Sequence, residues 1–189
     1  MTKPDVIFAP ICPEAMDRAI ELARISERDT VYEMGCGDAR LLIAAAKRHG
    51  CKGVGFEVRP ELIEEANKRA QAAGVSHLVT IKEQDMFTVD LRPADVVFLY
   101  ILPHLNLRMI PQLLDMRRGS RIVSSDFDIV RHIPDVVVQD YLVERNIYKT
   151  TFLYYAPLRH QVQPVKKEWV ESRICYDSND LSLLPMEMR

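Results

Sequence analysis

The stretch "VYEMGCGDAR", residues 31–40, places an acid and two closely spaced glycines after an apolar run. Glycines at positions 35 and 37 let a backbone approach a ligand closely and present free N–H groups to it. Glu57 lies 20 residues after Gly37, and an acid at the end of the next strand can bind ribose hydroxyls. Neither signal is specific by itself, but together they predict a site for a ribose-bearing cofactor.

The residue at position 40 separates two classes of cofactor. The dinucleotide pattern GxGxxG requires a third glycine there, so that helix and strand pack closely around a pyrophosphate. This chain has Arg40 instead, which argues against NAD and FAD. S-adenosylmethionine has no phosphate, and an acid that precedes the glycines, Glu33, is placed to meet its ammonium group. The residues therefore favour S-adenosylmethionine.

The stretches "VYEMGCGDAR", "GVGFE" and "EQDMF" resemble the successive cofactor motifs of class I S-adenosylmethionine-dependent methyltransferases. The resemblance implies that the loop after the first strand holds the methionine part of the cofactor, that the acid after the second strand holds its ribose, and that the residues after the third strand hold its adenine. The residues implied are Glu33, Gly35, Cys36 and Gly37 for the first role, Glu57 for the second, and Asp85 and Met86 for the third.

Two of these positions carry an alternative or a departure. Asp85 could equally be a capping or turn acid. Ala39 stands where the family usually has a third glycine, and we expect Ala39 to have helical dihedral angles, which an alanine tolerates.

Three further stretches are similar to one branch of this family: "FAPICPEAMDRAIELARI", "LYILPHLNLRMIPQLL" and "GSRIVSSDFDI". This branch comprises small prokaryotic protein-lysine methyltransferases and the mitochondrial enzyme that methylates a lysine of the c-subunit of ATP synthase. The similarity runs from about Phe8 to Pro157 and implies a lysine side chain on a protein as the acceptor. Unlike the mitochondrial members, this chain shows no N-terminal hydrophobic anchor, so a membrane substrate is not expected.

The candidate residues for the acceptor side follow the fourth and fifth predicted strands. Tyr100, which we also expect to contact the cofactor, and Asn106 follow the fourth strand, which faces the transferable methyl group in this fold. Asp126 and Asp128, in or after the fifth strand, could accept hydrogen bonds from an incoming ammonium. Each has a structural alternative: core packing for Tyr100, a helix N-cap for Asn106 and a strand-end turn for Asp128.

Other acceptors remain open at this point. The chain lacks the Asn/Asp-Pro-Pro-aromatic run of N6-adenine and glutamine-amide methyltransferases, and it has no cysteine after the fourth strand for cytosine-C5 chemistry. A small-molecule methyltransferase and a non-catalytic cofactor-binding interaction module are the alternatives to a protein-lysine methyltransferase.

Hydrophobic periodicity alternates between strand and helix along the chain. Strands are predicted over residues 29–35, 51–57, 77–85, 94–102, 120–129, 135–143 and 149–157. Helices are predicted over residues 13–25, 41–49, 60–75 and 106–116, the last disturbed at Pro111. Alternating strands and helices imply an α/β, Rossmann-like, doubly wound and mostly parallel seven-stranded sheet, which the last two strands close with an antiparallel edge hairpin.

Composition adds the remaining expectations. The 189 residues suit one methyltransferase domain over residues 1–156, which includes the N-terminal helix, and a C-terminal appendage of unknown role over residues 157–189 that packs on the domain or forms a homodimer. The net charge of −2 gives no strong nucleic-acid signal. Four scattered cysteines without a CxxC pair predict no metal site. The longest apolar run, residues 96–102, is too short to span a membrane, and we expect a cytoplasmic protein.

Overall fold

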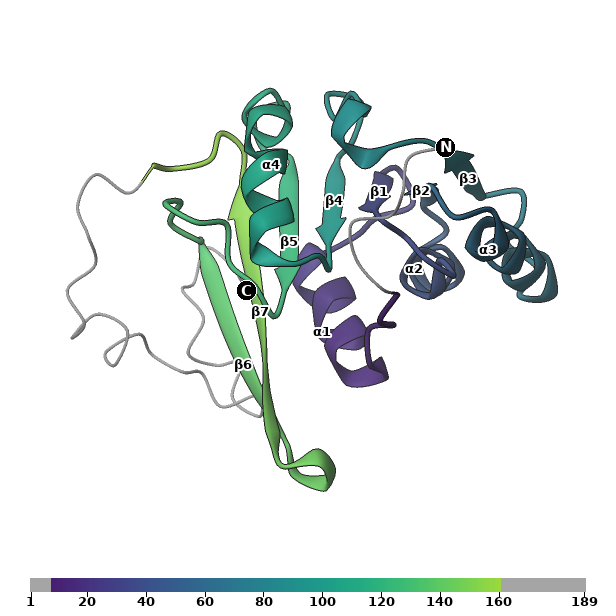
Figure 1. The fold of residues 1–189 in the computed structure, drawn as a ribbon, viewed down its shortest axis with the longest axis horizontal. Coiled ribbons are helices and arrows are strands. Elements are labelled where there is room, and N and C mark those ends of the chain that lie inside the picture. Colours follow the sequence, from purple (N-terminus) through teal and green to yellow (C-terminus); the bar gives the residue numbers. More distant parts are fainter. Residues whose placement is uncertain (1–7, 161–189) are drawn as a thin grey trace.

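The computed structural model describes residues 8–160, which form a seven-stranded sheet between two layers of helices (Figure 1). The strand order is β3-β2-β1-β4-β5-β7-β6. Strands β1 to β5 pair in parallel, whereas β7 pairs antiparallel with both β5 and β6. The predicted doubly wound, mostly parallel sheet with an antiparallel edge hairpin is confirmed.

The strands are β1 (Thr30–Met34), β2 (Lys52–Glu57), β3 (Val79–Glu83), β4 (Val96–Leu99), β5 (Arg121–Ser125), β6 (Val136–Leu142) and β7 (Ile147–Tyr155). The helices are α1 (Pro13–Ala23), α2 (Arg40–His49), α3 (Pro60–Ala72) and α4 (Pro103–Leu114), with short 3-10 turns η1 (Met86–Thr88) and η2 (Val143–Arg145). None of the helices in this part of the chain is long and apolar enough to cross a membrane.

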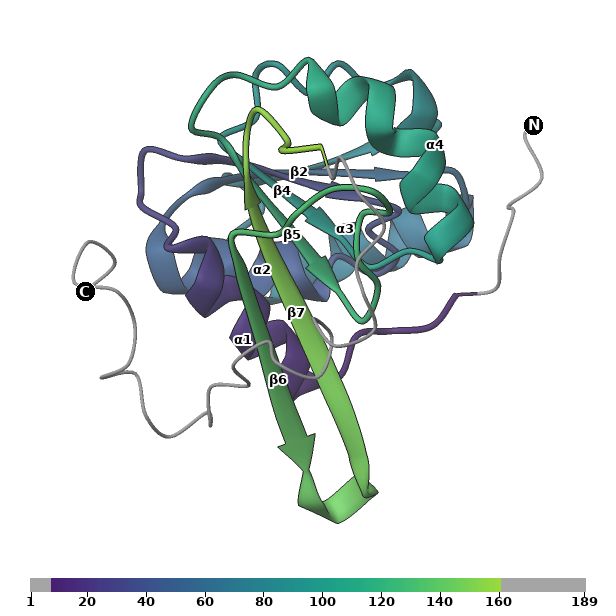
Figure 2. The same cartoon turned by 90° about the vertical axis from the view of Figure 1, so that its left-hand side faces the viewer.

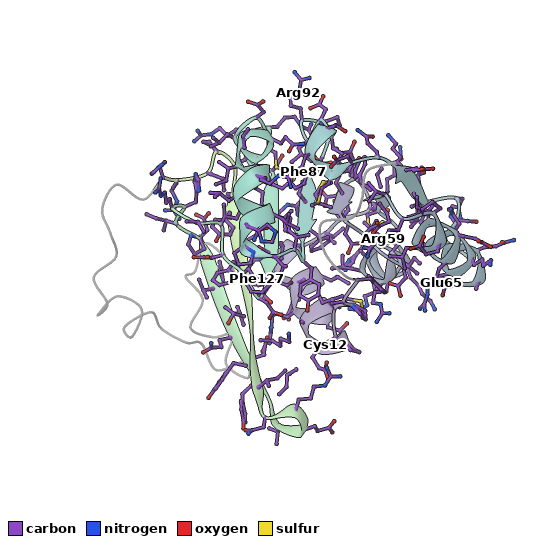
Figure 3. The ribbon with its side chains drawn as sticks, viewed as in Figure 1. Cys12, Arg59, Glu65, Phe87, Arg92 and Phe127 are labelled. Atoms are coloured by element: carbon purple, nitrogen blue, oxygen red, sulfur yellow. The ribbon has the colours of Figure 1, made fainter. Side chains whose placement is uncertain are left out.

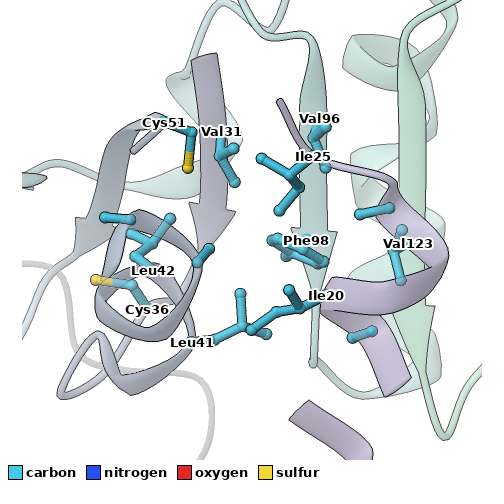
Figure 4. Packing of buried hydrophobic residues seen from close by; sticks show 14 of the residues in the cluster. Ile20, Ile25, Val31, Cys36, Leu41, Leu42, Cys51, Val96, Phe98 and Val123 are labelled. Atoms are coloured by element: carbon cyan, nitrogen blue, oxygen red, sulfur yellow. The ribbon is translucent and has the colours of Figure 1, made fainter. Parts of the chain in front are cut away.

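Each face of the sheet has its own apolar cluster. Helices α1, α2 and α3 cover one face, where Ile20 and Leu42 belong to one buried cluster with strand residues such as Phe98 (Figure 4). Helix α4 covers the other face, where Met109 and Leu113 pack with residues of β4, β5 and β7 (Figure 2). Strand β4 is buried along its whole length because it is covered on both sides, as its continuous apolar sequence predicts.

The strand order reverses between β1 and β4, and this reversal fixes where a ligand can bind. Strand β1 lies between β2 and β4, and in the register Glu33 stands beside Gly55 on one side and Phe98 on the other. In such sheets ligands bind in the crevice at the carboxyl ends of the strands on either side of the reversal. The loops after β1, β2 and β4 therefore meet at one place.

The hairpin of β6 and β7 extends well past the ends of the other strands (Figure 2). Helix α1 anchors it, since Arg18 donates two hydrogen bonds to Asp140, from Nε at 2.9 Å and from Nη2 at 2.8 Å. The predicted C-terminal appendage, with its expected role in a homodimer, lies outside the described residues except for positions 157–160.

Helix α4 differs from its prediction at both ends. It begins at Pro103, with Leu102 as the N-cap, and it continues through Pro111 to Leu114. A proline suits the first turn because that N–H has no intrahelical acceptor. Pro111 removes one hydrogen bond, to the carbonyl of Leu107, and Leu107 is exposed to water. Asn106 is therefore inside the first turn and is not the N-cap.

Candidate functional site

A cavity of about 350 Å³ opens at the carboxyl ends of β1, β2 and β4, where the topology predicts a ligand site. The structure brings eight of the predicted residues together in its wall: Glu33, Gly35, Cys36, Glu57, Asp85, Met86, Tyr100 and Asp126. In Figure 3, Arg59 lies on the side of α3 and Phe127 near the start of α4. Gly37, Asn106 and Asp128 are not in the cavity wall as described.

The loop after β1 turns through three residues with left-handed backbone: Gly35 at φ +67°, Gly37 at +55° and Ala39 at +56°. The expectation of helical dihedral angles at Ala39 is wrong. The turn brings the N–H of Ala39 to the carbonyl of Cys36 at 2.8 Å and makes Ala39 the residue before α2. Glycine adopts this left-handed conformation without steric cost, which explains why the family usually has a glycine here. In this chain Ala39 adopts the same conformation with backbone strain.

Glu33 is a buried acid with an unused acceptor. Its side chain lines the cavity, its exposure is 7%, and its Oε2 has no hydrogen-bond partner among the described residues. Burial, reinforced by the charge of Asp38, raises the pKa of Glu33 to about 8. Such a carboxyl gains most from a cationic partner, and a ligand's ammonium group would supply one.

Glu57 is also a buried acid, but, unlike Glu33, it accepts hydrogen bonds on both of its oxygens, from five N–H groups in all. Gly37 N donates to Oε2 at 3.0 Å, and the backbone N–H groups of Val58 and Arg59 donate to Oε1. The Arg59 guanidinium adds hydrogen bonds to both oxygens. Although burial favours the neutral acid, the hydrogen bonds from Arg59 and Val58 hold the pKa of Glu57 below its usual value. Glu57 is therefore an ionised carboxylate at neutral pH.

Phe8 places the N-terminal segment over this part of the cavity. Its ring lies so close to Gly37 that a Cβ there would be 2.3 Å from the ring. The guanidinium of Arg59 lies 5.7 Å from the centre of the same ring. Gly37 therefore serves the site twice, since its φ is positive and its missing side chain leaves room for Phe8.

A second close approach packs the β1 loop on β2. A Cβ at Gly55 would lie 2.6 Å from Cys36 Sγ, so glycine at position 55 makes room for the Cys36 side chain. Burial raises the pKa of the Cys36 thiol far above its usual value. Cys36 is consequently a neutral packing residue of the cavity wall and lacks the thiolate that a nucleophile needs.

Asp85 and Met86 line the side of the cavity nearest β3. The Asp85 side chain accepts a hydrogen bond from Phe87 N at 3.0 Å and caps η1, so the capping interpretation of this acid is correct. Its place in the cavity wall is compatible with a ligand contact as well. Met86 Sδ lies 3.9 Å from the position of a Cβ at Gly35, which joins this side to the β1 loop.

Tyr100 and Asp126 form the far end of the cavity, after β4 and β5. Asp126 has an unusual positive φ of +66°, and its Oδ2 lies 2.6 Å from the ammonium of Lys149 in β7. Burial raises the pKa of the Tyr100 phenol above its usual value, with Lys149 and Asp126 acting in opposite directions on it. The Tyr100 hydroxyl is neutral at physiological pH.

Asn106 and Asp128 stand behind this end of the cavity rather than in its wall. Asn106 is fully buried, and its Nδ2 lies 3.4 Å from Ser124 Oγ and 3.3 Å from the carbonyl oxygen of Asp128. Its amide also lies 3.4 Å from the carbonyl of Phe127. Asn106 therefore holds the loop after β5 that carries Asp126 and Phe127, and Asp128 takes part through its backbone.

Several wall residues were not predicted from the sequence: Phe8, Asp38, Arg40, Arg59, Gln84, Ile101, Leu105 and Phe127. Arg59 could have been found, because a cation two residues after a strand-end acid can pair with it. Phe8 stands in the segment whose similarity to the family was noted, but its packing on Gly37 depends on a tertiary contact that no local pattern reveals.

The residues of the cavity fit S-adenosylmethionine. Glu33 offers a buried carboxyl whose Oε2 has no hydrogen-bond partner among residues 8–160, the loop after β1 reaches the cavity wall at Gly35, and Glu57 is an ionised acid at the end of β2. Arg40 pairs with Asp38 at 2.6 Å beside the start of α2, where a dinucleotide site would have a glycine.

Residues 33–136 match the ANTKMT methyltransferase domain, which is more than half of the chain. A protein-lysine N-methyltransferase of Saccharolobus islandicus is 34% identical over 153 residues, which cover 80% of this chain and 94% of that protein. The lysine N-methyltransferase of Mus musculus that acts on the C-subunit of ATP synthase is 29% identical over 133 residues, and these span 68% of this chain but only 51% of the mouse protein.

Among solved structures, a Salinibacter ruber protein described as an RNA methyltransferase, in complex with S-adenosyl-L-homocysteine, is 36% identical with a TM-score of 0.72. The match covers 84% of this chain and 97% of that one. The strand order, the motif loop and these similarities agree with one another. The chain belongs to the ANTKMT methyltransferase domain family, within the class I S-adenosylmethionine-dependent methyltransferases.

Proposed function

We propose that this methyltransferase modifies a lysine side chain of a protein. The observation that carries the proposal is the far end of the cavity, where the neutral Tyr100 hydroxyl and the paired Asp126 carboxylate face the space next to the cofactor residues. The names of the relatives from Saccharolobus islandicus and Mus musculus support the same acceptor.

S-adenosylmethionine, when bound, supplies a methyl group on a positively charged sulfur. In our proposal Glu33 accepts from its ammonium group, Glu57 from its ribose hydroxyls, and Asp85 with Met86 lines the adenine side. Glu57 is already saturated by five donors, so a ribose hydroxyl takes the place of one of the two hydrogen bonds from the Arg59 side chain. Phe8 packs on Gly37 beside this end of the cavity.

The acceptor amine must be neutral to attack. With a reference pKa of about 10.4, deprotonation of a lysine at pH 7 costs roughly 4–5 kcal/mol. A buried wall with oxygen acceptors lowers this cost, because burial disfavours the ammonium and the acceptors align the lone pair. Tyr100 and Asp126 provide such acceptors, and the surplus proton of the amine leaves to solvent.

The test uses methyl-labelled S-adenosylmethionine and the proteins of a cell lysate, untreated or with their lysines acetylated. We expect label in the untreated proteins only, and peptide mapping should place it on lysine. Label that persists after acetylation would reject the lysine acceptor while leaving the methyltransferase in place.

Two other acceptors are covered by the same experiment. The Salinibacter ruber relative is described as an RNA methyltransferase, so one sample contains purified RNA and another is treated with ribonuclease. A third contains only the small molecules of the lysate. Label confined to RNA or to small molecules would assign the enzyme to that acceptor class instead. A cytoplasmic location stays a prediction, which fractionation of the source cells would check.

A further inference from the structure

Lys149 brings a cation to the acceptor end of the cavity, and none of the cofactor or acceptor motifs includes it. Its Nζ lies 2.6 Å from Asp126 Oδ2, and both side chains are only 18% exposed. Strand β7 pairs with β5 in a register that sets Thr151 beside Ser125, and Asp126 N donates to the carbonyl of Thr150 at 2.7 Å. The sheet itself therefore fixes the pair.

A second acid stands close to Lys149 but is already neutralised. Asp140 lies directly across from Lys149 in the register of β6 and β7. Arg18 of α1 takes both of its oxygens, at 2.9 and 2.8 Å. Lys149 therefore pairs with Asp126. The Arg18–Asp140 and Lys149–Asp126 ion pairs lie next to each other on the face of the hairpin that packs against α1.

The charges at the acceptor end can be counted from every element that faces it. The loop after β4 contributes Tyr100, the loop after β5 contributes Asp126, and the N-cap of α1 contributes Cys12. Although burial disfavours a charged ammonium, the hydrogen bond to Asp126 holds the pKa of Lys149 above its usual value. Lys149 remains a cation, and with the Asp126 carboxylate it gives this end no net charge.

We propose that Lys149, by neutralising Asp126, makes the acceptor end bind the substrate lysine as a neutral amine and so sets the pH dependence of methyl transfer. This inference rests on the proposed function. An unpaired carboxylate would hold the substrate as an ammonium, which has no lone pair. With Lys149 in place, the ammonium loses a proton to solvent, and its lone pair forms the bond to the methyl carbon while the electrons of the breaking carbon–sulfur bond stay on sulfur. Lys149 acts through Asp126 and is a positioning residue.

The experiment measures kcat and KM between about pH 6 and pH 10, with cytochrome c as the lysine-bearing acceptor. Lys149→Met removes the cation, and Lys149→Arg keeps it. The double variant Lys149→Met/Asp126→Asn removes both charges and again leaves no net charge. Lys68→Met is the matched control, because Lys68 makes an ion pair of the same 2.6 Å length with Glu64 on α3. Calorimetry with S-adenosyl-L-homocysteine shows that the cofactor site of each variant is intact.

We expect Lys149→Met to move the rising limb of kcat upward by about one pH unit, so that kcat is about tenfold lower near pH 7 and converges with that of the unaltered enzyme at high pH. Its KM should fall or stay the same, since the ammonium is held more tightly. Lys149→Arg and Lys68→Met should keep the original pH profile. The double variant should keep the midpoint of that profile at a lower kcat, because Asp126 is one of the acceptors that align the amine.

A loss of kcat by the same factor at every pH would overturn the inference and show that Lys149 only stabilises the loop. A double variant that keeps the shifted profile of Lys149→Met would also overturn it. Methylation of fully acetylated cytochrome c, or an unaltered enzyme that labels neither cytochrome c nor the untreated lysate proteins at any pH, would count against the proposed function and with it the inference. If the reaction depends on lysine but kcat varies with pH in the same way in all variants, the inference is overturned and the proposed function stands.

Discussion

The backbone N–H of Gly37 donates a hydrogen bond to the carboxylate of Glu57 at 3.0 Å, and this contact joins the β1 loop to the end of β2. Both residues were predicted for the cofactor site, but from separate motifs. The hydrogen bond shows that Glu57 shapes the loop, in addition to the role that we propose for it as an acceptor for the ribose. Its substitution should therefore affect cofactor affinity more strongly than the loss of one ligand contact would suggest.

Glu57→Ala should weaken the binding of S-adenosyl-L-homocysteine by at least about 1.5–3 kcal/mol, the usual value of a hydrogen bond to a charged group. Isothermal titration calorimetry measures this. Glu83→Ala is the matched control, because Glu83 pairs with Glu57 in the register of β2 and β3 but is exposed to water. Equal affinity of the two variants would show that Glu57 takes no part in binding.

The pKa of Glu33 predicts how the cofactor-free protein responds to pH. The folded pKa of about 8 exceeds the ordinary value of 4.5, so the folded state binds a proton that the unfolded chain has released. This contribution to stability is fully present below about pH 4.5 and is lost as the pH rises towards 8. Glu33→Gln has no proton to lose at this position. Near pH 8 its free energy of unfolding, measured by urea denaturation, should exceed that of the unaltered protein by on the order of 2–4 kcal/mol.

The same carboxyl predicts a proton linkage of binding. A ligand's ammonium favours ionised Glu33, so binding near pH 6.5 should release about one proton, as calorimetry in buffers of different ionisation enthalpy would show. Glu33→Gln should lose this release and bind more weakly. Proton release that is identical in the variant would remove Glu33 from the ammonium site.

Ala39 provides a test of backbone strain. A left-handed alanine costs roughly 1–2 kcal/mol, which a glycine avoids. Against this, glycine has greater freedom in the unfolded chain, and the substitution removes the buried methyl group of Ala39. These effects nearly cancel, so Ala39→Gly should change stability by less than about 0.5 kcal/mol. Ala45→Gly in α2 loses an equally buried methyl from helical backbone and should be less stable by on the order of 1–2 kcal/mol. Chemical denaturation of both variants measures the difference, and equal losses would contradict the strained conformation.

The sequence predicts the fold well because its signals are local. Alternating periods mark all seven strands, and Gly35, Gly37 and Glu57 stand at strand ends that the topology must bring together. Tertiary contacts account for what was missed. The conformation of Ala39 depends on how the loop meets α2, and Asn106 was expected at the acceptor although the earlier start of α4 turns it into a buried anchor.

The ion pair of Lys149 and Asp126 shows the same limit more clearly. The two residues are 23 positions apart, and only the antiparallel register of β5 and β7 makes them neighbours. The sequence supports Asp126 as an acceptor for ammonium, whereas the structure gives that carboxylate a cation of its own. A single sequence provides strand order more readily than it provides register.

Tyr100→Phe separates the acceptor end of the cavity from the cofactor end. The hydroxyl is neutral and lines the wall beside Asp126. Its removal takes away the oxygen that aligns the amine in our proposal and leaves the ring in place. We expect kcat to fall about 10–100-fold, equivalent to roughly 1.4–2.7 kcal/mol of lost transition-state stabilisation. The affinity for S-adenosyl-L-homocysteine should change less than threefold, because Glu33, Glu57 and the β1 loop are untouched. Tyr148→Phe is the control, since Tyr148 is 64% exposed on the hairpin. Cofactor affinity that falls as far as kcat would instead place the Tyr100 hydroxyl on the cofactor.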